Sequence, residues 1–386
     1  MRSNGLILLV VSALVGWAGA AEAGWEEGLA ALKAGKYADA AREFQAVTEQ
    51  HQDWPDGFFM LGQSLQKLNR NDDALKAFRT AYDLNPNEPR YQLKLGEAYL
   101  RANRYREAAE ALERVKVASL PKEQQAPYHQ MVAVAMEKSG RSGQALQALK
   151  QAAAANPGNA DAQFNYGAAA FNAGNTAEAE AALAKAVSLD GSDAAKRKAY
   201  VDVLLRQGRE ARGDAKVQAY RKAVDAAGQL ARQQPTYDNY LLLGEAQLGA
   251  TQYQEAAASF NTAATKKSGD WLPHFYMGQA YTASQSYSDA EAALRKALAT
   301  NPGRDNQVRV LKQLAFVYEK EKKFDDAIKA YNDAGDSAGA TRVQENAEIT
   351  KHNQQVEKEQ AEYDRLKKEE EELKKKLQQL ETGPPR

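Results

Sequence analysis

The sequence predicts an all-α protein: an α-solenoid of about nine helix pairs, followed by one long, charged helix. Two observations carry this prediction. Small residues recur 34 residues apart over much of the chain, with apolar residues following them at helical spacing. Beyond residue 341 this repeat stops and a run rich in Lys and Glu begins. One helix pair cannot bury its apolar side alone, so units of equal length predict a stack.

Three positions define the repeat. Gly28, Gly62 and Gly96 are 34 residues apart, and so are Gly244 and Gly278. An alanine follows each of these glycines after twelve residues, and further units hold alanine at the same position. These alanines are Ala40, Ala74, Ala108, Ala145, Ala179, Ala256, Ala290 and Ala327. A bulky apolar residue comes four residues later in every case. These residues are Phe44, Phe78, Leu112, Leu149, Leu183, Phe260, Leu294 and Tyr331.

Each unit is interpreted as two short amphipathic helices. The small residue in the first helix allows the second helix to approach closely, and the alanine lies at the same crossing. We expect the bulky residue to fill the space between units. Several second helices precede an Asn-Pro pair, at Pro86, Pro157 and Pro302. Proline cannot continue a helix and restricts the residue before it, so these pairs mark helix ends.

These motifs resemble the tetratricopeptide repeat family. The clearest copies are MLGQSLQKLNRNDDALKAFRTAYDLNP, residues 60–86, and KLGEAYLRANRYREAAEAL, residues 94–112. The resemblance covers about residues 24–336. It implies a right-handed α-solenoid that binds a protein or peptide partner on its concave face.

The spacing departs from 34 residues in three places. Gly96 and Ala133 are 37 residues apart, as are Gly278 and Ala315, so these two units are longer. The 77 residues from Ala179 to Ala256 leave room for one more unit and about nine extra residues. We expect an irregular helix pair there, roughly 194–209 and 214–233, which bends or divides the array; a simple loop or helix extension is the alternative. The expected organisation is repeats 1–5 over 24–193, the irregular pair over 194–235, repeats 7–9 over 236–336 and a charged helix with a frayed tail over 337–386.

Residues 1–23 have the pattern of a secretory signal peptide. Arg2 precedes an apolar run, residues 5–17, and small residues with two A-x-A-like cleavage sites follow. Cleavage is expected after Ala23 or after Ala20. The alternative is a retained membrane anchor, although the run is shorter than the ~20 residues a span requires. We therefore expect a mature protein without a membrane span, located in a bacterial periplasm or secreted.

The charged C-terminal segment carries apolar residues in two heptad rows. One row holds Ile349, Val356, Tyr363 and Leu377; the other holds Leu366, Leu373 and Leu380. Charged or polar residues interrupt both rows, at Glu370 in the first and at His352 and Glu359 in the second. Two hypotheses remain open: weak coiled-coil association with another copy or a partner, and a solvated helix that caps the array.

Composition excludes several kinds of site. Lys and Arg total 51 and Asp and Glu total 51, so no net charge attracts nucleic acid or anionic lipid. The chain has no cysteine, which removes disulfides, thiolate metal sites and cysteine nucleophiles. Its four histidines are far apart, and no phosphate loop, G-x-S-x-G or H-E-x-x-H motif occurs. We expect no enzymatic activity, no cofactor, no metal and no nucleic-acid partner.

The family resemblance places the partner-binding face on the first helices, just before and after the small residue. These positions mix apolar side chains with amide and acidic groups, which suits an extended peptide or a helix. The candidate residues are Phe59, Gln63, Leu93, Glu97, Phe164, Phe171, Leu241, Glu245, Phe275, Gln279 and Phe316. For each aromatic residue, packing against a neighbouring unit is the alternative.

One subtype of the family clamps a C-terminal carboxylate with Lys, Asn and Arg side chains from three first helices. Arg90 and Lys94 match the last pair of that pattern, but Trp25, Leu29 and Met60 stand at the earlier positions. We therefore expect no such clamp. The leading hypothesis is a non-catalytic interaction scaffold in the cell envelope. The alternatives are a self-assembling structural protein and a regulatory subunit of an envelope, secretion or polymer-export complex.

Overall fold

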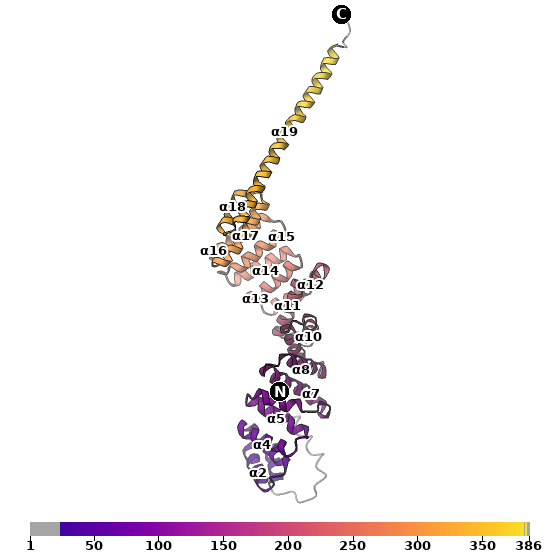
Figure 1. Cartoon of the computed structure of the whole chain (residues 1–386), viewed down its shortest axis with the longest axis vertical. Helices are drawn as coiled ribbons and strands as arrows, with labels where there is room; N and C mark the ends of the chain where they lie inside the picture. Colours follow the sequence, from indigo (N-terminus) through magenta and orange to yellow (C-terminus); the bar gives the residue numbers. More distant parts are fainter. Residues whose placement is uncertain (1–23, 382, 384–386) are drawn as a thin grey trace. The chain divides into compact units, whose positions relative to one another are not determined.

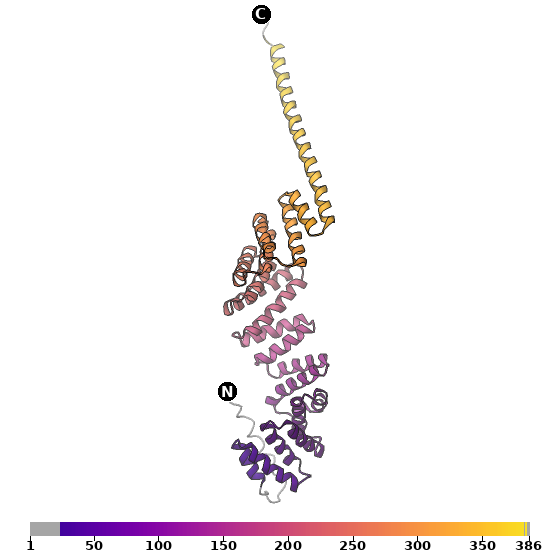
Figure 2. The same cartoon turned by 90° about the vertical axis from the view of Figure 1, so that its left-hand side faces the viewer.

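The computed structural model describes residues 24–381 and 383, in which every regular element is helical (Figures 1 and 2). The described residues hold nineteen α-helices and one 3-10 helix, which confirms the all-α prediction. None of these helices is both long enough and apolar enough to cross a membrane. The expected signal peptide falls on residues 1–23, outside the described residues. The chain divides into two compact units, which meet between Lys196 and Arg197.

Unit 1 is a stack of helix pairs in which every helix packs against its neighbours along the chain. Its helices are α1 (Trp25–Lys33), α2 (Tyr37–Gln50), α3 (Pro55–Lys67), α4 (Asn71–Leu84), α5 (Pro89–Arg101), α6 (Tyr105–Glu113), η1 (Val117–Ser119), α7 (Lys122–Lys138), α8 (Ser142–Ala155), α9 (Ala160–Asn172) and α10 (Thr176–Leu189). The first turn of α11 (Ala194–Glu210) also belongs to unit 1.

Unit 2 contains the rest of α11 and continues the same alternation. Its further helices are α12 (Gly213–Gln233), α13 (Tyr237–Gly249), α14 (Tyr253–Lys266), α15 (Trp271–Ala283), α16 (Tyr287–Ala299), α17 (Arg304–Lys320), α18 (Phe324–Asp333) and α19 (Ser337–Glu381). The first helices of the two lengthened repeats, α7 and α17, have 17 residues where most first helices have 13. In the expected irregular region, α11 has 17 residues and α12 has 21.

Most turns between the two helices of a pair pass through a residue with positive φ. Asn69 and Asn103 have φ of 59° and 56°, and Gly140 and Gly174 both have 83°. After Asn69, the backbone N–H of Arg70 donates to the carbonyl of Leu65 at 3.0 Å, which closes the Schellman pattern of a helix end. Glycine and asparagine tolerate this left-handed conformation best, so in these pairs the local sequence favours the helix end. Thr251, Gln285 and Lys322 take the same position in unit 2, where residue type gives no such signal.

The recurring spacing of glycine and bulky residue creates a close crossing in six of the pairs. A Cβ atom added to Gly62 would lie 2.8 Å from the ring of Phe78, and one added to Gly244 would lie 2.5 Å from the ring of Phe260. Gly278 and Leu294 repeat this contact at 2.5 Å. The bulky residue therefore packs on the glycine of its own unit as well as toward the next one, where the Phe260 ring stacks on Tyr276 at 5.2 Å. A side chain at the glycine would occupy the same volume.

Helix α19 begins as part of unit 2 and then leaves it. Ala340, Val343 and Ala347 are buried against the preceding helices, and Arg342 binds Glu319 at 2.8 Å. From Lys351 to Gln378 every side chain is exposed. Figures 1 and 2 show this second part as a single straight helix beyond α18. The first three turns thus cap the stack, and the remainder is stabilised within the helix alone.

Candidate functional site

First helices of successive pairs contact one another directly in both units. Helix α5 contacts α7 in unit 1, and α15 contacts both α13 and α17 in unit 2. Between α3 and α5, Gln66 Nε2 donates to Glu97 Oε1 at 3.3 Å. First helices therefore line one side of each unit, as the inner side of a curved stack requires.

Two positions on each first helix face this side: the residue directly after the small residue, and the residue one turn later. We call these residues the first-helix surface. In unit 1 they are Leu29, Leu32, Gln63, Gln66, Glu97, Leu100, Val134, Glu137, Ala168 and Phe171. In unit 2 they are Arg209, Glu245, Leu248, Gln279, Thr282, Phe316 and Glu319. Every one of these side chains is half-buried or exposed, so the whole set is reachable from solvent.

Three of the residues predicted to bind partners belong instead to the core. Phe59, Leu93 and Phe275 are at most 9% exposed. All three stand three residues before the small residue, where the side chain points between helices. The Phe59 ring lies 5.9 Å from that of Phe78 in its own pair and 5.2 Å from that of Tyr91 in the next. Their selection as accessible anchors is wrong, because the stack needs this row to join one pair to the next.

The other candidates remain within reach of a partner. Phe164 and Leu241 occupy the same row as Phe59 but are half-buried. Gln63, Glu97, Phe171, Glu245, Gln279 and Phe316 all lie on the first-helix surface, and Phe316 is 38% exposed. Their role in binding stays a prediction.

Val134 is the residue that the sequence reasoning overlooked. It lies on α7, directly after Ala133, and its side chain is 45% exposed. The 37-residue spacing from Gly96 marks Ala133 as the small residue of this longer unit, so the position directly after it could have been selected from the sequence. Val134 and Phe171, on α7 and α9, are thus accessible apolar side chains on the first-helix surface of unit 1, which also carries polar side chains such as Glu97 and Glu137.

The charges on this surface are held in place by local pairs. Lys94 Nζ lies 2.6 Å from Glu97 Oε2, and Arg101 lies 3.2 Å from Glu97 Oε1. Burial by itself would raise the pKa of Glu97, but the two cations outweigh it and hold that pKa below its usual value. Glu97 therefore presents a fixed carboxylate at neutral pH. Arg90 likewise binds Asp56 at 2.9 Å, so the cations considered for a carboxylate clamp are paired within the chain.

Unit 2 combines charged and aromatic groups along the same row. Arg209 forms an ion pair with Glu245, and Lys320 lies 5.1 Å above the ring of Phe316. Gln313 Nε2 donates to Thr282 Oγ1 at 3.3 Å, which links α17 to α15. Such groups can hold a partner through hydrogen bonds and apolar contacts. In the described residues no cluster of His, Asp and Glu has the arrangement of a metal site.

Two shallow cavities, of about 360 Å³ and 380 Å³, lie away from the first-helix surface. The first is lined by the loop after α4 together with Tyr82 and Arg114, and the second by Arg42 and Gln45 of α2 and residues near the end of α3. Side chains at equal intervals on successive first helices suit an extended or helical partner.

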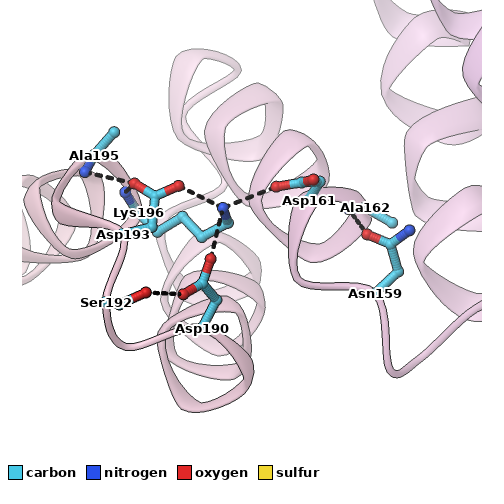
Figure 3. A network of polar contacts seen from close by, with 8 residues as sticks. All are labelled: Asn159, Asp161, Ala162, Asp190, Ser192, Asp193, Ala195 and Lys196. Carbon is cyan, nitrogen blue, oxygen red and sulfur yellow. Dashed lines mark hydrogen bonds and ion pairs between the residues drawn. The ribbon is translucent and has the colours of Figure 1, made fainter. Parts of the chain in front are cut away.

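A cluster of Lys196 with three aspartates lies at the end of unit 1 (Figure 3). Lys196 Nζ also lies 6.0 Å from the centre of the Phe164 ring. Lys196 Nζ lies 2.8 Å from Asp161 on α9, 3.4 Å from Asp190 after α10, and within bonding distance of Asp193. Asp193 also accepts the backbone N–H groups of Ala195 and Lys196, which caps α11. The carboxylates of Asp161 and Asp193 raise the pKa of Lys196. This cluster ties the first turn of α11 to α9 and α10, next to a predicted binding residue.

Comparisons with known proteins find one matching family and several similar structures. A family model described as tetratricopeptide repeat matches residues 26–58, 59–123 and 135–194. No curated protein sequence matches the chain. Similar solved structures include YrrB, a TPR protein with an unusual peptide-binding site, with 20% identity over 52% of this chain and 96% of that one, at a TM-score of 0.43.

Two further structures are similar to parts of the chain. MamA from Desulfovibrio magneticus RS-1 has 18% identity over 46% of this chain and 95% of that one, at a TM-score of 0.39. A tetratricopeptide repeat protein from Parabacteroides merdae ATCC 43184 has 13% identity, 66% and 96% coverage and a TM-score of 0.40. Proteins with these repeats generally serve as scaffolds for protein partners. The match of the family model shows that the chain contains tetratricopeptide repeats between residues 26 and 194, and the same glycine crossing recurs beyond them in unit 2.

Proposed function

We propose that the chain is a non-catalytic scaffold that holds an extended or helical segment of a partner protein along its first-helix surface. The observation that carries this proposal is the exposure of that row. The neighbouring row of Phe59, Leu93 and Phe275 is buried to join the pairs, whereas the first-helix surface stays half-buried or exposed in every repeat. Side chains at equal intervals along a stack can contact a chain at several points.

The composition of the row supports a peptide as the ligand. Val134 and Phe171 offer apolar contacts, and Gln63 and Glu97 offer hydrogen-bond acceptors on the same surface of unit 1. Glu97 already accepts from Gln66, Lys94 and Arg101, so its position is fixed before a partner arrives. A preorganised acceptor costs less entropy on binding than a mobile one. The proposed ligand therefore carries apolar side chains flanked by amide or basic donors.

We place this scaffold in an exported compartment of a bacterium, on the strength of the N-terminal sequence. A fusion of the full chain to a reporter enzyme that is active only after export should be active. The same fusion lacking residues 1–23 should be inactive while remaining abundant. Equal activity of both fusions would reject export, and it would leave the binding proposal unaffected.

Site-specific photo-crosslinking tests the binding surface. A photoreactive amino acid is placed at Val134 or Phe316, both exposed on first helices, or at Leu84 or Leu189, which are exposed ends of second helices. Peptides selected from a random library on residues 24–386 serve as the probe. Crosslinks from Val134 or Phe316, and none from the two controls, support the proposal. Crosslinks confined to Leu84 and Leu189, or a library that yields no binder, overturn it.

A matched pair of double variants then measures the contribution of unit 1. For peptides that crosslink at Val134, V134A/F171A should raise the dissociation constant about tenfold, which corresponds to ~1.4 kcal/mol. The control L84A/L189A removes two apolar side chains from the same unit and should change it by less than about twofold. Circular dichroism melting confirms that all variants fold. An unchanged affinity of V134A/F171A would remove the first-helix surface of unit 1 from the site.

A further inference from the structure

The second part of α19 exposes large apolar side chains that nothing in the described chain covers. Ile349, Tyr363, Leu366, Leu373 and Leu377 are 52–65% exposed, and Val356 is 48% exposed. Elsewhere in the described chain such residues are mostly buried between helices. An exposed row on an otherwise solvated helix costs free energy unless a partner covers it.

These residues recur with the period of a coiled coil. Ile349, Val356, Tyr363 and Leu377 occupy heptad position a, and Leu366 and Leu373 occupy position d. The segment from Tyr363 to Leu377 is the best-formed part, since Glu370 alone interrupts it. The side chain of Leu380, also counted in this row, lies outside the described residues.

The charges beside this row are complementary to those of a second, parallel copy. Glu362 and Glu369 stand at position g, and Lys367 and Lys374 stand at position e. In a parallel, in-register pair each g residue faces the e residue five positions later in the other helix. Glu362 then meets Lys367 of the second copy, and Glu369 meets Lys374, each twice by symmetry.

An antiparallel pair has the opposite effect. There e faces e and g faces g, so that among these four positions every contact joins two lysines or two glutamates. Like charges directly opposed are destabilising, and charges at e and g set orientation and choice of partner more than affinity. The same charges also disfavour a strongly acidic or strongly basic partner helix.

We propose that α19 binds the α19 of a second copy of this chain, as a parallel two-stranded coiled coil centred on Tyr363–Leu377. The apolar row supplies the association, and the Glu-Lys pairs select the parallel register. Glu370 occupies heptad position a in the seam and weakens the dimer, because a charged side chain there lowers stability while it helps to specify the register. Dimerisation would double the number of first-helix surfaces in one assembly and so raise avidity for a multivalent partner.

Charge reversal tests the pairing. K367E/K374E puts acidic groups at both e and g, and E362K/E369K puts basic groups at both. Sedimentation velocity of residues 24–386 should show a concentration-dependent dimer for the unchanged chain and a monomer for either variant. An equimolar mixture of the two variants should again form a dimer. The control K368E/K375E makes the same change in charge at outward positions and should still dimerise.

Three outcomes would overturn the proposal. The first is an unchanged chain that stays monomeric at every concentration. The second is a control, K368E/K375E, that loses as much dimer as the two test variants do. The third is a mixture of the two test variants that forms no heterodimer. E370L offers a further check, because it should strengthen the dimer by removing the charge from the seam. These variants lie outside the first-helix surface, so peptide crosslinking at Val134 should be unaffected, and the two proposals can fail separately.

Cysteine crosslinking tests orientation, and the chain has no native cysteine to interfere. In a parallel dimer Leu366 faces Leu366 of the second copy, so L366C should oxidise to a covalent dimer. A disulfide requires Cα atoms within about 7 Å. E371C, at an outward position, should crosslink much more slowly. A mixture of L366C and L377C that forms mainly the mixed disulfide would show an antiparallel pair and refute the proposed register.

Discussion

The paired helices of the two units and the second part of α19 use similar residues but are stabilised differently. In the pairs, alanine, leucine and aromatic residues are buried at tight crossings, such as Phe78 on Gly62. In α19, Leu373 and Tyr363 are more than 60% exposed, and the nearby contacts are local pairs such as Lys374 with Glu370 at 2.6 Å. The difference teaches that helical periodicity alone does not say whether an apolar row is core or free surface.

The largest expected effect separates core from surface. Phe59→Ala should lower the free energy of unfolding of unit 1 by about 3–5 kcal/mol, since it empties a packed site between two pairs. Tyr363→Ala on α19 should change the unfolding of unit 2 by less than ~0.5 kcal/mol. Urea unfolding of residues 24–386, followed by tryptophan fluorescence, measures both. If Phe59→Ala had the same free energy of unfolding as the unchanged chain, Phe59 would not be part of the core and would again be a candidate for partner binding.

An intermediate effect tests the glycine crossing. In Gly62→Ala the added methyl group meets the Phe78 ring at 2.8 Å, and overpacking of this kind costs about 1–3 kcal/mol. Alanine gains about 1 kcal/mol of helix propensity, so we expect a net loss of ~1 kcal/mol in unit 1. The reverse change on α19, Ala361→Gly, should lower helix content without altering the unfolding midpoint of unit 2.

The second variant G62A/F78A checks the cause of that loss. Alanine at position 78 removes the ring that the methyl group meets, so the double variant should lose less than the sum of the two single changes. Strictly additive losses would argue against contact between these two positions.

The smallest expected effect compares a tertiary ion cluster with a local pair. Lys196→Gln should lower the melting temperature at neutral pH, whereas Lys374→Gln should leave it unchanged, because an exposed pair within one helix contributes little. Hydrogen bonds from Ser192 and Lys196 lower the pKa of Asp190, and the bond from Lys196 lowers that of Asp193. The carboxylates of Asp161 and Asp193 raise the pKa of Lys196.

The pH dependence of this difference follows from the signs of the shifts. Carboxylates with lowered pKa values stabilise the fold above their unfolded value near 3.8, and this contribution disappears as the pH falls through the lowered values. Because the pKa of Lys196 is raised by folding, its charged form stabilises the fold fully at pH values below its usual pKa. This stabilisation is lost as the pH rises through the raised pKa. The effect of Lys196→Gln should therefore be constant around neutrality and shrink in strong acid. A melting difference that persists at pH 2 would contradict this account.

Much of the fold could be predicted from the sequence, because its signals are local. The spacing of Gly62 to Phe78 recurs in six pairs, and residues such as Asn69 mark the turns. The candidate site was predicted only in part. Gln63 and Phe59 stand four residues apart on one helix, yet one is reachable and the other is buried against Tyr91. The Lys196 cluster was not predicted, because it joins Asp161 of α9 to two aspartates of the loop between α10 and α11, about 30 residues later in the sequence.

The sequence by itself determined the repeat length, the order of the helices and the position of each close crossing, since these depend on backbone sterics and on residues within one unit. Only the tertiary structure decided which apolar row of a first helix joins neighbouring pairs and which stays accessible. It also showed where α19 leaves the stack, after Ala347. The physical reason is that burial depends on what the next pair places opposite a side chain, and helical periodicity does not contain that information.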